Sequence, residues 1–261
     1  MYLDFWKLDR RPFDNTPDPD FFYPSQEHEE ALSRFFYVIE ENKGAAMLTG
    51  EYGCGKTMTL RKIFASLDEE KYEVAYLNNP RWEPDELLQD ILFQLGVEDY
   101  PSGIMELGRK IGDVLFQNVD KGKETIIVID EAQLIHSDLV LEELRLILNY
   151  QLNDMFMVCL ILAGQPELRE RVMGMPQLEQ RMFIKYHLHT FDYDNTKDYI
   201  AHRLKIAGSA RPIFTDDSIE AIYKHSFGTP RRINNICDIS LMIGSQKKIE
   251  MIDSNFIKSV I

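Results

Sequence analysis

The residues AAMLTGEYGCGKTMTLR, at positions 45–61, contain the pattern G-x-x-x-x-G-K-[ST] of a phosphate-binding loop. Gly50, Gly53 and Gly55 allow the backbone to curl so that several N–H groups point at phosphate oxygens. We expect Lys56 to reach the β- and γ-phosphates and the Thr57 hydroxyl to hold Mg²⁺. The pattern predicts a strand, a phosphate loop and a helix; a glycine-rich turn before a helix is the alternative.

A second stretch, TIIVIDEAQ at positions 125–133, predicts a buried strand that ends in Asp130 and Glu131. Four apolar β-formers in a row are typical of a central parallel strand, and ligands lie at the carboxyl edge of such sheets. We expect Asp130 to accept hydrogen bonds from the waters around Mg²⁺ and Glu131 to polarise the attacking water. The alternative is an ordinary strand end, which the phosphate loop upstream disfavours.

The charge of the chain disfavours two classes of binding partner. The 261 residues include 29 basic and 43 acidic side chains, which gives a net charge of −14. Ten basic and nine acidic residues lie from Phe191 onward, so the excess acidity belongs to the first 190 residues. This balance argues against a broadly basic nucleic-acid surface and against simple attraction to anionic lipid. Any contact with DNA would need a local basic patch.

Three scattered cysteines, Cys54, Cys159 and Cys237, indicate neither a disulfide framework nor a zinc site. Cys54 lies inside the phosphate loop, where it is either an oxidation-sensitive brake or a tolerated small residue. The longest apolar run, residues 155–163, is far too short to span a membrane, and the N-terminus lacks the apolar stretch of a signal peptide. We therefore expect a cytoplasmic protein, with membrane association through a partner left open.

Strand and helix patterns alternate along the first 190 residues. Predicted strands cover residues 45–49, 72–77, 125–130, 156–162 and 184–188, with helices between them. This alternation implies right-handed crossovers and a parallel sheet. Residues 1–24, rich in aromatic residues and proline, predict an extended strap packed on the core. From residue 191 only helices are predicted, over 195–207, 216–227, 230–246 and 253 to the end, which is the layout of a lid.

The whole chain resembles a known family. The opening MYLDFWKLDRRPFDNTPDPDFFYPSQEHEEAL, then GEYGCGKT, IDEAQ, LAGQPELRE and FGTPRRINNICD, are similar to AAA+ ATPases of the ExeA/GspA type, which serve type II secretion and related envelope assemblies. The resemblance implies an α/β P-loop NTPase fold: a parallel five-stranded sheet with flanking helices in residues 1–190, and a small all-helical lid domain in residues 191–261. Family members usually continue into a membrane helix and a peptidoglycan-binding region, and this chain is expected to be a stand-alone relative or a fragment.

The resemblance also implies roles for residues outside the two motifs. Tyr23 and the residues after it occupy the place of the segment that flanks adenine, with Phe13 nearby, although either aromatic ring could equally be core. Gln165 stands where the family places a polar sensor, usually Asn, Ser or Thr. Arg181 stands where a neighbouring subunit delivers an arginine finger, with Arg169 and Arg171 as competitors. Arg231 matches the lid's second sensor, and Arg232 is expected at the surface.

The implied chemistry is ATP hydrolysis between protomers of a nucleotide-dependent homo-oligomer, with Glu131, Lys56, Arg181, Gln165 and Arg231 as the reacting set. The predicted contacts to ATP or ADP are Gly50, Glu51, Tyr52, Gly53, Cys54, Gly55, Lys56, Thr57, Met58, Phe13, Tyr23, Pro230 and Arg231. Thr57 and Asp130 are the predicted Mg²⁺ ligands.

Three uses of such an ATPase are open. The implied output is remodelling of a secretion or envelope machine through a protein partner. The first alternative is an ATP-dependent regulator of DNA transposition that assembles on DNA, which the net charge does not favour. The second is a nucleotide switch with negligible turnover, which Glu131 disfavours; a small-molecule kinase is less supported still, because no lid arginine cluster is apparent.

Overall fold

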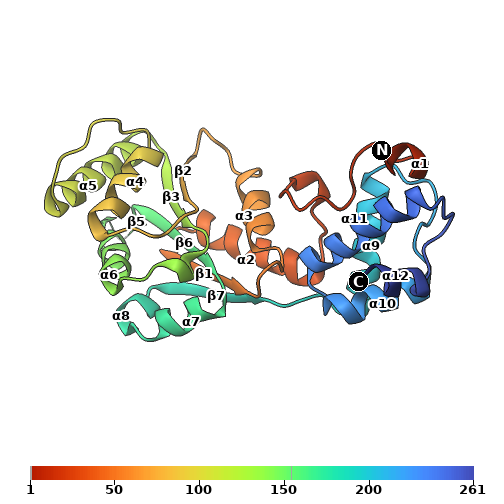
Figure 1. The fold of residues 1–261 in the computed structure, drawn as a ribbon. Coiled ribbons are helices and arrows are strands. Elements are labelled where there is room, and N and C mark those ends of the chain that lie inside the picture. Colours follow the sequence, from red (N-terminus) through yellow and green to blue (C-terminus); the bar gives the residue numbers. More distant parts are fainter. Residues whose placement is uncertain (1, 154) are drawn as a thin grey trace. The chain divides into compact units, whose positions relative to one another are not determined.

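A computed structural model describes residues 2–153 and 155–261, which divide into two compact units (Figure 1). Unit 1 comprises Met1–Glu29, Glu51–Lys62 and His189–Ile261. Unit 2 comprises Glu30–Gly50 and Ile63–Leu188. The chain therefore passes between the units four times, and each unit is built from separate segments.

Unit 2 is built on a five-stranded sheet whose strands are all parallel. The strands are β1 (Ala45–Gly50), β2 (Tyr72–Leu77), β3 (Glu124–Ile129), β6 (Val158–Gly164) and β7 (Met182–Leu188). Their order is β2-β3-β6-β1-β7, so β1 lies between β6 and β7. The predicted parallel five-stranded sheet with flanking helices is confirmed, and β2 has the bounds that the sequence pattern predicted.

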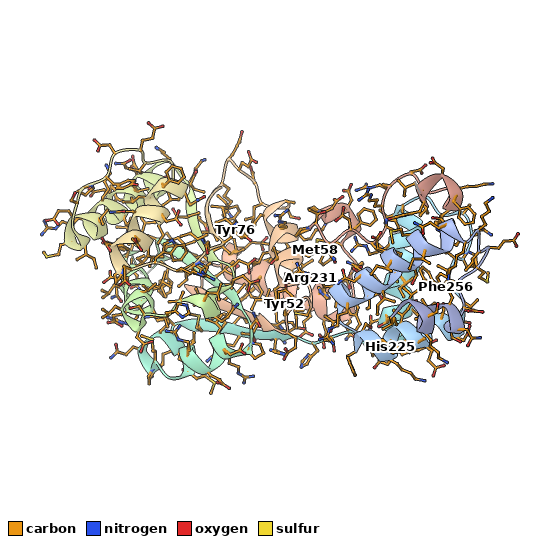
Figure 2. All side chains as sticks on the ribbon, in the orientation of Figure 1. Tyr52, Met58, Tyr76, His225, Arg231 and Phe256 are labelled. Carbon is orange, nitrogen blue, oxygen red and sulfur yellow. The ribbon has the colours of Figure 1, made fainter. Side chains whose placement is uncertain are left out.

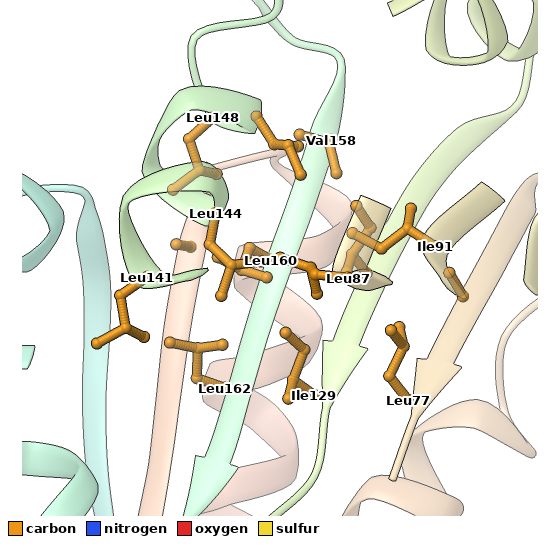
Figure 3. Close-up of a cluster of buried hydrophobic side chains, with 14 of the residues drawn as sticks. Leu77, Leu87, Ile91, Ile129, Leu141, Leu144, Leu148, Val158, Leu160 and Leu162 are labelled. Carbon is orange, nitrogen blue, oxygen red and sulfur yellow. The ribbon is translucent and has the colours of Figure 1, made fainter. Parts of the chain in front are cut away.

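Both faces of the central strands are buried, as the continuous apolar runs require. All six residues of β1 and all seven of β6 are buried. On one face, leucines of α4 (Pro84–Gln94) and α6 (Asp138–Ile147) lie over the sheet, as Figure 3 shows for Leu87, Leu141 and Leu144. Because these leucines recur every three or four residues, each helix presents one apolar stripe to the sheet.

The other helices of unit 2 follow the predicted alternation. Unit 2 contains α2 (Gln26–Glu40) from Glu30 onward and the end of α3 (Lys56–Phe64) from Ile63 onward. It also contains α5 (Ile104–Asp120), α7 (Pro166–Met173) and α8 (Pro176–Glu179), and the short 3-10 turn η2 (Ala132–Leu134) after β3. Proline at the first turn begins α4, α7 and α8, where its missing N–H leaves no hydrogen bond unmade.

One prediction placed a strand two residues too early. Residues 156–162 were expected to form a single strand, but Met155–Phe156 is β5, which pairs antiparallel with β4 (Gln151–Leu152), and β6 begins at Val158. The Met157 amide donates to the Tyr150 carbonyl at 3.0 Å, which ties this residue to the small hairpin. Apolar composition alone could not separate a hairpin strand from the buried strand that follows it.

Unit 1 contains the C-terminal helices, which form an all-helical region as predicted. They are α9 (Tyr193–Ile206), α10 (Asp216–Ser226), α11 (Pro230–Gln246) and α12 (Ser254–Val260). Side-chain caps begin three of them: Asp192, Thr215 and Asp253 each accept from the backbone N–H three residues later. Because the capping residues and Pro230 are local sequence signals for a helix start, the starts of these helices could be predicted closely from the sequence.

Residues 2–24 of the strap pack on these C-terminal helices, and they are only partly extended. Residues 2–6, which contain no proline, form α1 (Tyr2–Trp6), and Pro19–Phe21 forms the 3-10 turn η1. Trp6 and Phe13 are buried in one apolar cluster with residues of α9 to α12. The Trp6 indole N–H donates to the Leu241 carbonyl at 2.9 Å, so the strap is held by polar as well as apolar contacts.

Arg203 of α9 is a buried cation that fastens the strap, with 3% of its surface exposed. Its guanidinium donates to the carbonyls of Pro12 and Asp14, and to the Tyr199 hydroxyl at 2.7 Å. The Phe21 ring covers it at 4.8 Å. Because a buried guanidinium without acceptors is costly, these carbonyls tie the strap to α9.

The predicted boundary between residues 190 and 191 stays a prediction. The compact unit that holds the C-terminal helices also includes the strap and the segment Glu51–Lys62. Among residues 2–153 and 155–261, no helix combines the length and the apolar character that crossing a bilayer requires.

Candidate functional site

The phosphate loop adopts backbone conformations that only glycine takes easily. Gly53 has φ 84° and Gly55 has φ 108°. A Cβ at Gly53 would lie 2.8 Å from Cβ of Arg231, and one at Gly55 would lie 2.8 Å from Nε2 of His28. Glycine is therefore required at both positions for two reasons: the φ angle is positive, and another side chain packs where a Cβ would lie.

Lys56 is the first residue of α3 and is 6% exposed. Its ammonium donates to the Glu51 carbonyl at 3.1 Å, and the Cys54 amide donates to the same carbonyl at 3.2 Å. The Glu51 carbonyl thus accepts two hydrogen bonds from within the loop. The positive N-terminal end of α3 begins at the same place, at Lys56. Thr57, half-buried, follows in the first turn of the helix.

Arg231 contacts the loop within unit 1. Its backbone amide donates to the Gly53 carbonyl at 3.3 Å. Its guanidinium lies 4.6 Å from the centroid of the Tyr52 ring and donates to the Tyr52 hydroxyl, and the two side chains are adjacent in Figure 2. Pro230, buried, begins α11 just before it. The second-sensor role of Arg231 remains a prediction, and its contact with the loop supports it.

Phe13 and Tyr23, predicted beside the adenine, both lie in the apolar cluster of unit 1. Phe13 is 1% exposed and packs edge-on against Phe214. The Tyr23 hydroxyl donates to Asn195 at 3.2 Å, and its ring contacts Tyr199. These contacts are those of core residues, which was the alternative interpretation, and an adenine contact by either ring stays a prediction.

Cys54 is fully buried, and burial raises the pKa of its thiol. A raised pKa leaves little thiolate at neutral pH, and the thiolate is the form that oxidants attack. The structure therefore favours the interpretation of Cys54 as a small buried residue over an oxidation-sensitive brake.

In unit 2, Asp130 and Glu131 follow the end of β3. Asp130 is 3% exposed; it accepts from the Tyr76 hydroxyl and from the Glu131 amide, each at 2.9 Å. Glu131 has φ 54°, a left-handed conformation that is uncommon outside glycine and costs free energy. The turn directs the two carboxylates to different partners.

Gln133 lies beside Glu131, although no role for it was predicted from the sequence. Its side-chain amide donates to the Glu131 carboxylate at 2.7 Å and accepts from the Gln165 amide at 3.0 Å. Gln133 thus joins the end of β3 to the end of β6 and to the start of α7. The signal in the sequence was the motif IDEAQ, in which Gln133 stands two residues after the acid.

Gln165, half-buried, is placed as predicted just beyond β6, where it precedes Pro166 at the start of α7. Its backbone, rather than its side chain, makes the contact to Gln133 described above. A sensor role for the Gln165 side chain stays a prediction.

Arg181 lies just before β7 and is half-buried. Its guanidinium donates to the Leu148 carbonyl at 2.9 Å and to the Asn149 side chain at 2.6 Å, at the C-terminal end of α6. Arg171 pairs with Asp138 at 2.9 Å, whereas Arg169 has an exposed side chain on α7. The arginine-finger assignment stays a prediction, and Arg181 has a structural partner within its own chain.

Two histidines of unit 1 are expected to make the protein less stable below pH 6.5. Burial lowers the pKa of both His28 and His202. Because the unfolded chain then binds more protons, stability falls as the pH drops from 6.5 through the folded-state pKa values of the two rings. Urea unfolding at pH 7.5 and 5.5 should show a smaller pH-dependent loss for His202→Gln than for the wild type. An equal loss in both would contradict the assignment for His202.

The chain is similar to known proteins over most of its length. The family described as AAA domain matches residues 39–172. The chain is 37% identical over 246 residues to general secretion pathway protein A of Aeromonas hydrophila; that match covers 93% of this chain and 44% of the relative. The chain thus spans less than half the length of that protein.

Solved structures share the fold at lower identity. The ORC2 protein of Aeropyrum pernix, in its ADPNP-ADP complexes, matches with a TM-score of 0.71 at 18% identity over 97% of this chain and 71% of its own. Drosophila ORC bound to DNA matches with a TM-score of 0.75 at 14% identity, over 98% of this chain and 65% of its own. The RuvB branch migration motor of Thermotoga maritima matches with a TM-score of 0.62 at 20% identity, over 98% and 72%.

Proposed function

This chain belongs to the AAA domain family, and we propose that it is an AAA+ ATPase of the ExeA/GspA type that binds and hydrolyses Mg-ATP at an interface between protomers. The output that we propose is assembly or remodelling of a secretion or envelope system. The relative that supports this output is a general secretion pathway protein, of which this chain matches 44%.

The strand order of unit 2 is the main structural support for the proposed ATPase activity. Only β6 separates β1 from β3, so the carboxyl ends of these two strands lie about 10 Å apart at one edge of the sheet. The phosphate loop leaves β1 after Gly50, and Asp130 and Glu131 leave β3 after Ile129. An ammonium group on one loop and two carboxylates on the other suit a triphosphate and its attacking water.

Each residue has a distinct proposed role. The amides of the loop and Lys56 bind the phosphates, since both donate to anionic oxygens without a proton transfer. Glu131 accepts a proton from the attacking water as the bond from water oxygen to the γ-phosphorus forms and the bond from that phosphorus to the bridging oxygen breaks, which releases ADP. Gln133 holds the Glu131 carboxylate and so fixes its direction.

The donor set fits Mg²⁺. Thr57 and Asp130 offer hard oxygen ligands, which this ion prefers. Within residues 2–153 and 155–261, no group of three or more His, Cys, Asp and Glu side chains could hold a metal by itself, so phosphate oxygens and water would complete the shell. Bound there, Mg²⁺ would neutralise charge on the phosphates.

Mixing two inactive variants tests whether the site is shared. Arg181→Ala keeps Glu131 but lacks the proposed finger, and Glu131→Gln keeps Arg181 but lacks the base. If Arg181 acts in a neighbouring protomer, an equal mixture should recover about a quarter of the wild-type phosphate release, because random association makes that share of interfaces complete.

The Arg169→Ala and Arg171→Ala variants, mixed in the same way with Glu131→Gln, identify the finger among the three arginines. Melting temperatures are needed as a control, because Arg181 also caps α6. No recovery with any of the three would contradict a finger supplied in trans by this helix region.

Retention on duplex DNA only in the presence of ATP, lost at raised salt, would instead support the transposition alternative.

A further inference from the structure

Tyr76 is the last residue but one of β2, and its hydroxyl takes no part in the chemistry proposed above (Figure 2). That hydroxyl donates to Oδ2 of Asp130 at 2.9 Å. The Glu131 amide donates to the other oxygen of the same carboxylate, Oδ1, also at 2.9 Å. Each oxygen of the buried Asp130 carboxylate thus accepts a hydrogen bond, one from the neighbouring strand and one from its own turn.

The pairing of β2 with β3 explains why these two side chains meet. In the parallel register Tyr76 lies beside Val128. The Asp130 amide donates to the Leu77 carbonyl at 2.8 Å, so the pairing continues past the end of β3. Because side chains alternate between the two faces of a sheet, Tyr76, Val128 and Asp130 share one face. Leu77 and Ile129 lie on the other face, in the apolar core with α4 and α6.

The Tyr76 ring is itself held in place. Phe64, the last residue of α3, packs edge-on against it, with ring centroids 5.6 Å apart and ring planes at 70°. Both residues belong to unit 2, and the Tyr76 side chain is half-buried. A tyrosine side chain has only two torsions before its rigid ring, so packing of the ring also fixes the position of the hydroxyl oxygen. The donor to Asp130 is therefore placed in advance.

Magnesium imposes a demand on this carboxylate that phosphate does not impose on the loop. The ion requires near-ideal octahedral geometry, so a carboxylate that serves it must be held in one orientation. Carboxylates at metal sites are in turn hydrogen-bonded, and loss of such an outer partner typically weakens metal binding by about 10- to 100-fold. The Tyr76 hydroxyl occupies the place of such a partner behind Asp130.

We propose that Tyr76 is a positioning residue for Mg²⁺, which holds the Asp130 carboxylate in the orientation that the ion requires. The proposal rests on the proposed function, in which Thr57 and Asp130 hold the ion. Tyr76 and Gln133 then have parallel tasks, since each fixes one of two adjacent carboxylates, Tyr76 from the neighbouring strand and Gln133 from the turn η2. The phenol acts on the metal only through Asp130 and makes no contribution to phosphate binding.

The same substitution at two places on β2 separates metal positioning from packing. Tyr76→Phe keeps the ring beside Phe64 and removes only the hydroxyl. Tyr72→Phe, at the other end of the strand, removes a hydroxyl that accepts from Lys71 at 2.8 Å, and it is the matched control. Each protein is saturated with a non-hydrolysable ATP analogue. Mn²⁺, which shares the preference of Mg²⁺ for oxygen ligands, is then titrated and followed by electron paramagnetic resonance.

We expect Tyr76→Phe to raise the dissociation constant for Mn²⁺ by about 10- to 100-fold, whereas Tyr72→Phe should stay within about twofold of the wild type. In EDTA, all three proteins should bind the analogue with affinities within about threefold of one another, because the phosphate contacts do not involve either tyrosine. Thermal unfolding confirms that each variant is folded. Wild-type affinity for Mn²⁺ in Tyr76→Phe, or an equal loss in Tyr72→Phe, would make Tyr76 a packing residue and overturn the proposal.

A double substitution tests whether Tyr76 acts through Asp130. Asp130→Asn alone should weaken Mn²⁺ binding, because the amide lacks the charge of the carboxylate. Adding Tyr76→Phe to Asp130→Asn should cause less than about a threefold further loss, since the effects of two residues in one hydrogen-bonded pair do not add. A further loss as large as that of Tyr76→Phe alone would show that the phenol affects the metal by another route, and the proposal would be wrong.

Failure of the proposed function gives a different result. Wild-type protein that binds neither the analogue nor Mn²⁺ would refute the Mg-ATP proposal, whereas equal binding of both by the wild type and Tyr76→Phe would refute only the role of Tyr76. If Tyr76→Phe does not fold, Phe64→Leu replaces it: loss of the packed ring leaves the phenol less restrained and should weaken Mn²⁺ binding about threefold. Unchanged affinity for Mn²⁺ in folded Phe64→Leu would then overturn the proposal.

Discussion

Replacing Lys56 by alanine is expected to abolish ATP binding, with a dissociation constant at least about 100-fold above that of the wild type. Lys56 is buried at the start of α3, and its ammonium lies within hydrogen-bond distance of the loop's own Glu51 carbonyl. A charge in this position is already desolvated, so its attraction to phosphate is weakened little by water. Alanine removes the charge and leaves the loop carbonyl without this donor.

Isothermal titration with Mg-ATP measures the loss directly. Lys62→Ala is the matched control, since Lys62 lies on the same helix six residues further on. We expect Lys62→Ala to bind ATP as the wild type does. Wild-type affinity in folded Lys56→Ala would remove the phosphate loop from the nucleotide site.

Replacing Glu131 by glutamine is expected to lower the rate of ATP turnover by about 10²- to 10⁴-fold while leaving the affinity for ATP within threefold of the wild type. Glutamine has nearly the shape of glutamate and keeps an oxygen that can accept from Gln133, so the turn after β3 is retained. It cannot take a proton from water at neutral pH. Binding and turnover should therefore separate.

Single-turnover phosphate release and ATP binding are the two measurements. Glu142→Gln is the control: Glu142 pairs with Arg145 on α6 at 2.7 Å and should leave turnover unchanged. Wild-type turnover by Glu131→Gln would show that another group is the base. In that case Asp130, held by Tyr76, would be the next residue to test.

The parts of the fold that the sequence predicted well are those set by local physical chemistry. Strand β2 is bounded by polar and turn residues, and Thr229 and Pro230 mark the start of α11, so both elements have the predicted limits. The parallel sheet followed from apolar runs long enough for burial on both faces. The β4–β5 hairpin was missed because its residues read as a continuation of the next strand.

The candidate site was predictable only where a residue's role depends on its neighbours in the sequence. The phosphate loop and the pair Asp130–Glu131 are such motifs. The packing of His28 against Gly55 joins residues 27 positions apart, and Gln133 reaches Gln165 across 32. No local pattern specifies such pairs, because they depend on which strands and loops the fold places side by side.

Arg203 has a consequence for the order in which the chain can become structured. Its acceptor at Pro12 precedes it by 191 residues, and the aromatic residues of the strap pack on helices that lie later still. During synthesis on a ribosome, the sheet strands emerge while the strap still has no surface to cover. Its tryptophan and phenylalanines are then exposed for most of translation, and they are the side chains a holdase chaperone would be expected to bind until α9 and α11 have been made.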